Sequence, residues 1–370
     1  MDQDLLDLYT DYLIASFGQA SATGLERLTD RRVSHDRVTR LLSVPPRTGA
    51  DLWRAVKPLV RQVQCDEAVL IFDDTIEEKP YTDENDIVAW HFDHTKGRSV
   101  KGINLVTALY GTPTVNVPVS FAVVAKTEAY TDQKTGKLRR RSPTTKNEQM
   151  RAMLRACIAN ELPFRYVLAD IWYGSSENMR VIHLDLKRHF CGYPIRSFPI
   201  KRNRLVALSA ADHASGSFVH VSAASLEPDR LYRVHLKEVP FAVSVVRQVF
   251  TGDATSPNED GSSGERYLVT SDEEATSEAL RAAYQRRWRV EEYHRSLKQN
   301  ASLAKSPTRR VATQTNHLFC SLLAYVKLER LRVSAKANHY ALKGRLYVRA
   351  LHSAFEELRR LKQGYPALAA

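Results

Sequence analysis

A run of residues near the C-terminal end of the chain carries a phenol, a guanidinium, a carboxylate and an ammonium group. Tyr284, Arg287, Glu291 and Lys298 stand at offsets of 0, 3, 7 and 14. At about 100° per residue these offsets fall within about 60° on one face of a predicted helix. A carboxylate flanked by cations suits a metal ligand beside a phosphate track. The spacing leaves a solvated face with pairs such as Glu291–Arg295 open as the alternative.

Three aspartates follow predicted strands. Asp73 and Asp74 come directly after the apolar run 68–72, and Asp170 follows the run 165–169. Carboxylates at the carboxyl ends of neighbouring strands converge at one edge of a sheet, and their oxygens suit Mg²⁺ or Mn²⁺. Because aspartate also favours turns, each of them alone is equally consistent with an ordinary strand end.

Taken together, these residues resemble a known family. The Tyr-x2-Arg-x3-Glu-x6-Lys spacing is similar to the Y-R-E-K signature of DDE transposases of the bacterial insertion-sequence-4 type. The resemblance implies that Asp73, Asp170 and Glu291 are catalytic and hold two Mg²⁺ ions, for which Mn²⁺ can substitute. A shift of one residue in strand register would exchange Asp73 for Asp74, so Asp74 stays open as the alternative first aspartate.

The resemblance also implies an activity. Such an enzyme cuts double-stranded DNA at terminal inverted repeats and joins the 3′-hydroxyl ends to target DNA by two-metal phosphoryl transfer. Tyr284, Arg287 and Lys298 would bind phosphates of the element end, and the protein would act as a homodimer or larger assembly. Two alternatives remain at this stage: an RNase H-like nuclease that cuts without joining, and a transposase-derived DNA-binding protein without activity.

The order of predicted elements indicates an α/β fold. Three strands with hairpin connections are followed by helix, strand, helix and strand, which is the order of an RNase H-like core with a mixed sheet and flanking helices. A β-rich stretch interrupts this core, and an all-helical segment precedes it. The predicted divisions are a helical DNA-binding domain at 1–65, the first part of the core at 66–200, a β-rich insertion domain at 201–275, the last part of the core at 276–330, and a helical region at 331–370.

Several basic residues outside the catalytic helix are candidates for DNA contact. Residues 23–42 resemble a helix-turn-helix whose second helix would present Arg37 and Arg40 to a groove, although an ordinary helical hairpin fits equally well. Lys201, Arg202 and Arg204 form a second basic run. The segment 126–143 is predicted to be a mobile basic loop that touches the DNA backbone through 137–141. A solvated basic loop is the alternative for both of these runs.

Composition is consistent with a nucleic-acid partner. The chain has 370 residues, with 54 Lys and Arg against 42 Asp and Glu, so its net charge is +12. A chain this basic favours a polyanion as its partner. Neither an apolar run long enough to span a bilayer nor a secretory signal pattern is apparent, and four cysteines are too few for a disulfide framework. We therefore expect a cytoplasmic protein, and the family resemblance implies that it is bacterial and acts on chromosomal or plasmid DNA.

Overall fold

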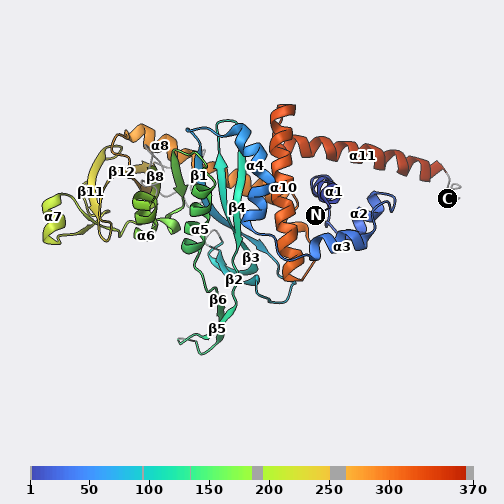
Figure 1. Ribbon diagram of the computed structural model, residues 1–370, viewed down its shortest axis with the longest axis horizontal. Coiled ribbons are helices and arrows are strands. Elements are labelled where there is room, and N and C mark those ends of the chain that lie inside the picture. Colours follow the sequence, from blue (N-terminus) through green and yellow to red (C-terminus); the bar gives the residue numbers. More distant parts are fainter. Residues whose placement is uncertain (1, 94–95, 134, 186–194, 251–263, 364–370) are drawn as a thin grey trace, which may run out of the picture.

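The computed structural model describes the chain except residues 1, 94–95, 134, 186–194, 251–263 and 364–370. Helices flank a mixed sheet, so the predicted α/β class is confirmed (Figure 1). The Thr251–Gly264 stretch, which its composition predicts to be a loop, lies almost entirely outside the described residues.

The centre of the sheet has antiparallel strands followed by parallel ones. β1 (Val69–Glu78) pairs antiparallel with β3 (Arg98–Gly111), and the other edge of β3 pairs with β2 (Val88–Asp93) and β4 (Asn116–Val123). β7 (Tyr166–Ala169) runs parallel to β1, and β8 (Ile195–Ile200) runs parallel to β7. The central sheet thus contains one antiparallel strand more than the three that the sequence predicts, because β2 lies where a loop between the first two strands is expected.

β1 is longer than predicted. All ten of its residues pair with β3, from Val69 opposite Gly111 to Glu78 opposite Gly102. Asp73 and Asp74 therefore lie inside a strand and do not follow its end, which corrects the prediction. Successive side chains of a strand point to opposite faces, so these two carboxylates occupy different environments.

The helices between the parallel strands begin at strong caps. α5 (Lys146–Ala159) starts with a capping box in which Thr145 and Glu148 satisfy each other's backbone N–H groups. After β7 come the short helices η1 (Ile171–Tyr173), α6 (Ser176–Arg180) and η2 (Val181–Asp185). The predicted helix over 176–190 is thus made of two short pieces as far as residue 185, and its last residues lie outside the described part of the chain.

The segment predicted as a mobile loop forms a β-hairpin. β5 (Glu128–Thr131) pairs antiparallel with β6 (Leu138–Arg141), and the ribbon projects away from the main sheet (Figure 1). Its turn is closed by hydrogen bonds around Asp132, and Gly136 supplies a positive φ of 67°. Ion pairs Arg141–Glu128 and Arg139–Asp132 join its two arms.

The predicted β-rich stretch extends the same sheet. Its strands are β9 (Leu205–Ala207), β10 (Val219–His220), β11 (Leu231–Leu236), β12 (Ala242–Phe250) and β13 (Gly264–Thr270), with the short helix α7 (Ala210–Ser215) between β9 and β10. β13 pairs antiparallel with β8, so the strand order runs without a break from β10 to β2. The β-rich part and the central strands are therefore joined edge to edge.

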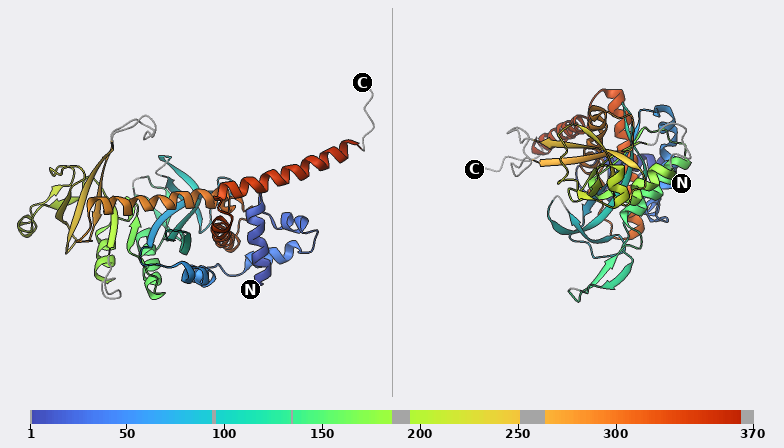
Figure 2. Two further views of the ribbon diagram at one scale, coloured as in Figure 1. Left: turned by 90° about the horizontal axis from the view of Figure 1, so that it is seen from above. Right: turned by 90° about the vertical axis from the view of Figure 1, so that its left-hand side faces the viewer.

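The N-terminal helices pack against a long C-terminal helix. α1 (Gln3–Ala15) and α3 (His35–Ser43) contact α10 (Val311–Ala335), while α4 (Gly49–Val63) packs on β4. One continuous hydrophobic core includes residues of these helices and of the sheet, for example Leu13, Val38 and Ile71. α2 (Ala22–Leu28) precedes α3, and α11 (His339–Gln363) extends away from the body toward the C-terminus (Figure 2). Among the described helices, none is both long and apolar enough to cross a membrane.

The predicted catalytic helix contains a tightened turn. It consists of α8 (Ser277–Gln285), the 3₁₀ turn η3 (Arg286–Trp288) and α9 (Arg289–Gln299), after which η4 (Leu303–Lys305) leads to α10. A 3₁₀ turn advances about 120° per residue and an α-helix about 100°, so three such residues rotate Tyr284 about 60° from its expected position relative to Glu291. The assumption of one straight helix over 284–298 is therefore corrected.

Candidate active site

Strand register brings two of the predicted catalytic aspartates to the same level. Phe72 of β1 is the partner of Ala169 in the parallel strand β7. Asp73 is the next residue of β1, and Asp170 directly follows the end of β7. Aligned residues of neighbouring strands point to the same face, so the register explains why both carboxylates line one cavity.

The carboxyl group of Asp73 is buried among other acids. Its side chain is 14% exposed, and its Oδ1 accepts a hydrogen bond from the Asp74 backbone N–H (2.8 Å). Burial, together with the charges of Asp74 and Glu291, raises the pKa of Asp73 to about 8, although Arg287 opposes this shift. A divalent ion would stabilise the ionised form of such closely spaced carboxylates, which only Arg287 among these charged residues favours here.

Arg287 of η3 and Glu291 of α9 face Asp73. Arg287 Nη1 donates to Glu291 Oε1 (3.2 Å) and lies 3.7 Å from Asp73 Oδ2. The Glu291 side chain is 41% exposed, so one side of the group stays open to solvent. The guanidinium therefore holds the two carboxylates near each other.

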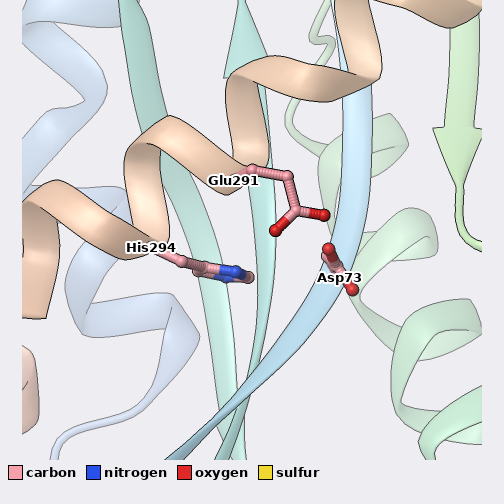
Figure 3. Close-up of side chains that lie close together, drawn as sticks. All are labelled: Asp73, Glu291 and His294. Atoms are coloured by element: carbon pink, nitrogen blue, oxygen red, sulfur yellow. The ribbon is translucent and has the colours of Figure 1, made fainter. Parts of the chain in front are cut away.

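His294 completes this group, and we did not single it out from the sequence. One ligand atom each from Asp73, Glu291 and His294 lie within 4.8 Å of one another (Figure 3). Burial and the nearby Lys298 lower the pKa of His294 to about 3, so the ring is neutral and has a lone pair. The Glu-x-x-His spacing, which places both side chains on one helix face, is the signal that points to it.

Asp74 and Lys146 line the same cavity as Asp73, but the Asp74 carboxylate has different hydrogen-bond partners. Lys146 Nζ donates to both of its oxygens (2.8 and 2.9 Å), Asn104 Nδ2 donates to Oδ2 (2.9 Å) and the Tyr173 hydroxyl donates to Oδ1 (3.0 Å). Burial raises the pKa of Asp74, but Lys146, Asn104 and Tyr173 outweigh it, and the net shift is downward. Four donated bonds use most of the acceptor capacity of this carboxylate.

Asp170 lies in the same cavity but outside the three-residue group. It precedes η1, and its Oδ1 accepts a hydrogen bond from the Ile171 backbone N–H (2.7 Å). The cavity has a volume of about 600 Å³ and is also lined by Asp73, Glu291, His294 and Lys298. The carboxylates that line the cavity fit divalent ions, and the solvent-accessible cavity with its lining Lys298 fits a phosphodiester strand.

The other residues of the four-residue helix pattern differ in exposure. Tyr284 is only 7% exposed, and its ring packs between the guanidinium groups of Arg266 and Arg287. Most of this side chain is thus unavailable to a phosphate, and it supports Arg287 instead. Lys298 lines the cavity, and its Nζ donates to the Ile76 carbonyl of β1 (2.9 Å).

The predicted basic run after β8 borders a second cavity of about 410 Å³. Lys201 Nζ lies 4.5 Å from the centre of the Trp172 ring, and Arg204 donates to the Ser176 hydroxyl. Arg202 is exposed and pairs with Glu265. Because Trp172 lines both cavities, this basic run adjoins the acidic one.

The predicted helix-turn-helix at 23–42 corresponds to α2 and α3, and its Arg37 and Arg40 lie on α3, which packs against α10. Arg40 is exposed, whereas Arg37 forms an ion pair with Asp2 (2.6 Å). Ser34 occupies the N-cap position of α3, but its side chain makes no capping hydrogen bond. The structure does not bring these residues to the acidic cavity.

Comparisons with known proteins agree with this geometry. A family model described as DDE superfamily endonuclease matches residues 2–192, and another described as Transposase DDE domain matches residues 120–327. Each match spans more than half of the 370 residues. No curated protein matches the chain significantly.

Proposed function

The chain belongs to the DDE superfamily of endonucleases and transposases, and on this premise we propose that it is a transposase of the insertion-sequence-4 type. It cuts double-stranded DNA at terminal inverted repeats and joins the 3′-hydroxyl ends to target DNA. The observation that carries this proposal is the meeting of Asp73, Asp170 and Glu291 in one open cavity beside Arg287 and Lys298.

The acidic residues fit divalent ions. Asp73, Asp170 and Glu291 supply hard oxygen ligands for two Mg²⁺ ions, and Mn²⁺ can substitute. Such a pair of ions activates an attacking hydroxyl and stabilises the departing oxygen. The raised pKa of Asp73 supports this assignment, because the crowded carboxylates lack enough neutralising charge in the protein alone.

The cations around the cavity place the DNA strand. Lys298 and Arg287 bind phosphates of the element end, with Tyr284 packed beneath Arg287. Lys201 and Arg204, which line the second cavity, continue this track together with the exposed Arg202 between them in the sequence. Contacts of this kind fix the position of the strand without reading its sequence.

The remaining parts of the chain supply recognition and assembly. We propose that residues 1–65 bind DNA, with Arg37 and Arg40 facing a groove, and that 201–275 act as the insertion domain of an RNase H-like core. The C-terminal region supports a homodimer or larger assembly, because Val348, Leu351, Phe355 and Leu358 of α11 are exposed at heptad spacing.

A strand-transfer assay tests the proposal. The terminal sequences flanking the gene supply the DNA ends, presented either intact or already cut to a 3′-hydroxyl. With Mg²⁺ we expect nicking of the intact end and joining of the cut end to a target plasmid. Cleavage without any joined product would favour a nuclease, and binding without cleavage would favour a DNA-binding protein that lacks activity.

We predict that the β5–β6 hairpin contacts the DNA backbone. Lys137, Arg139, Arg140 and Arg141 give the projecting ribbon an excess of positive charge, and a two-stranded ribbon fits a major groove. Each lost phosphate contact lowers the salt slope of log affinity by about 0.9. The double variant Lys137→Gln and Arg139→Gln should therefore reduce the slope by about 1 to 2.

A matched variant on α4 serves as the control for the hairpin. The double variant Arg54→Gln and Lys57→Gln removes the same two kinds of side chain as the hairpin variant. Arg54 pairs with nearby Asp51, as Arg139 pairs with Asp132, and Lys57 is exposed like Lys137. Affinity for the end is measured at several salt concentrations. If both double variants change the slope equally, the hairpin contributes only general charge and the predicted contact is wrong.

A further inference from the structure

His294 lies one helical turn after Glu291 on α9 and is almost fully enclosed, with 7% of its surface exposed. One of its ring nitrogens lies within 4.8 Å of carboxylate oxygens of Asp73 and Glu291 (Figure 3). Residues at i and i+3 share a helix face, and Glu-x-x-His is a known arrangement of two ligands on one helix. The geometry therefore supplies a nitrogen donor beside two oxygen donors.

Unlike buried His317, His294 leaves a buried ring nitrogen without a hydrogen bond among the described residues, as His91 and His183 also do. In His294 this atom is Nε2. By contrast, both ring nitrogens of His317 are bonded, to the Tyr9 hydroxyl (3.0 Å) and the Ser302 carbonyl (2.9 Å). A buried polar atom without a partner is costly, and a buried ring incompletely bonded beside two carboxylates indicates that the site binds something further.

We propose that His294 is a nitrogen ligand of a divalent ion held by Asp73 and Glu291. This inference rests on the proposed function, in which those two carboxylates bind metal. It makes the ligand set of that ion two carboxylates and one imidazole, with Asp170 outside it. Because imidazole suits transition metals better than Mg²⁺, this ion site should prefer Mn²⁺.

Pulsed electron paramagnetic resonance of Mn²⁺ bound to the full-length protein tests the proposal directly. Nitrogen in the coordination shell modulates the Mn²⁺ signal, so we expect ¹⁴N modulation in the wild type that disappears on labelling histidine with ¹⁵N. Bound Mn²⁺ without nitrogen modulation would overturn the assignment, and this result needs no variant.

Two substitutions extend the test. His294→Ala should abolish the modulation and weaken Mn²⁺ binding by about tenfold or more, since even outer-shell partners of a metal contribute that much. His294→Asn, which keeps an oxygen donor, should lose the modulation but narrow the difference between Mn²⁺ and Mg²⁺ affinity. Unchanged modulation in either folded variant would contradict the proposal.

His91 is the matched control. It is also buried with an unpartnered Nε2, but it lies on β2 outside the three-residue group. His91→Asn should therefore keep the modulation.

Glu291→Gln separates the role of His294 from the proposed metal site. If this variant binds Mn²⁺ as tightly as the wild type, the proposed metal site itself is wrong. If it loses Mn²⁺ binding but the wild type shows no nitrogen modulation, only the role of His294 is overturned.

Discussion

Replacing Asp73 by asparagine is expected to abolish DNA cleavage while stabilising the metal-free protein at pH 8. The amide removes a ligand whose metal supplies several kcal/mol of transition-state stabilisation, so cleavage should fall by about a thousandfold or more. The stabilising effect follows from burial, because Asp73 is enclosed beside Asp74 and Glu291 and its pKa rises to about 8. A neutral amide of the same shape avoids the cost of ionising this group.

The sign of the pH dependence follows from linkage. The folded protein holds the Asp73 proton up to about pH 8, whereas the unfolded chain releases it near its ordinary value of 3.8. Between these limits the folded state binds more protons, so wild-type stability declines as the pH rises through this window. The Asp73→Asn variant lacks this decline. Its advantage should be small at pH 4 and reach at least about 1 kcal/mol at pH 8.

Thermal melts in the presence of a chelator, at pH 4 and pH 8, measure this effect. Asp83→Asn, which changes an exposed acid, should leave the melting temperature unchanged at both values. Mg²⁺ should then stabilise the wild type but not the Asp73 variant, because only a protein that binds the ion gains from it. An Asp73 variant that melts lower than the wild type at pH 8 in the chelator would show that the carboxylate stabilises the fold.

The main features of the catalytic helix follow from local sequence. Periodicity alone puts Arg287, Glu291 and Lys298 near one another, and the apolar runs before Asp73 and Asp170 predict neighbouring strands. These features depend on residues close together in the chain. The alternation of side chains along a strand also predicts that Asp73 and Asp74 face opposite ways.

Other features depend on contacts that no local pattern contains. The partners of Asp74 come from β3, α5 and η1, so the sequence around Asp74 does not distinguish a structural acid from a catalytic one. The 3₁₀ turn at Arg286–Trp288 interrupts a stretch with an unbroken helical pattern. The β5–β6 hairpin does not follow from the sequence, because almost all of its strand residues are exposed on both faces and therefore lack the alternation that predicts a strand.

Two adjacent carboxylates thus differ because of what lies on each face of β1. Asp73 faces the catalytic helix, where acids gather and Arg287 is the nearby cation. Asp74 faces donors from three elements, and Lys146 neutralises its charge. The Asp73 carboxylate has one cation 3.7 Å away, whereas the Asp74 carboxylate accepts four hydrogen bonds, two of them from Lys146. This difference supports the proposal that Asp73 is the metal ligand. For Asp74 we expect the opposite effect of an asparagine substitution on stability.

Replacing Asp74 by asparagine is expected to destabilise the protein without removing metal binding. The amide keeps only one acceptor oxygen, so it cannot accept all the hydrogen bonds that Lys146, Asn104 and Tyr173 donate to the two carboxylate oxygens. It also leaves the charge of Lys146 unpaired. Breaking a buried ion pair costs about 3–5 kcal/mol of the free energy of unfolding. Because the Lys146 side chain is 40% exposed and partly screened by solvent, we expect a loss at the lower end, about 3 kcal/mol.

Its pH dependence should run opposite to that of the Asp73 variant. Because the pKa of Asp74 is lowered in the fold, its contribution is present above the unfolded value of 3.8 and is lost as the pH falls through the lower folded value. Denaturant unfolding at pH 7 and pH 3 should therefore show a large difference from the wild type at pH 7 and a small one at pH 3. Below its melting temperature the Asp74 variant should still bind Mn²⁺ and retain measurable cleavage. A folded Asp74 variant that binds no Mn²⁺, together with an Asp73 variant that binds it normally, would identify Asp74 as the first catalytic aspartate. Lys146, which donates to Asp74, would then be part of the metal site.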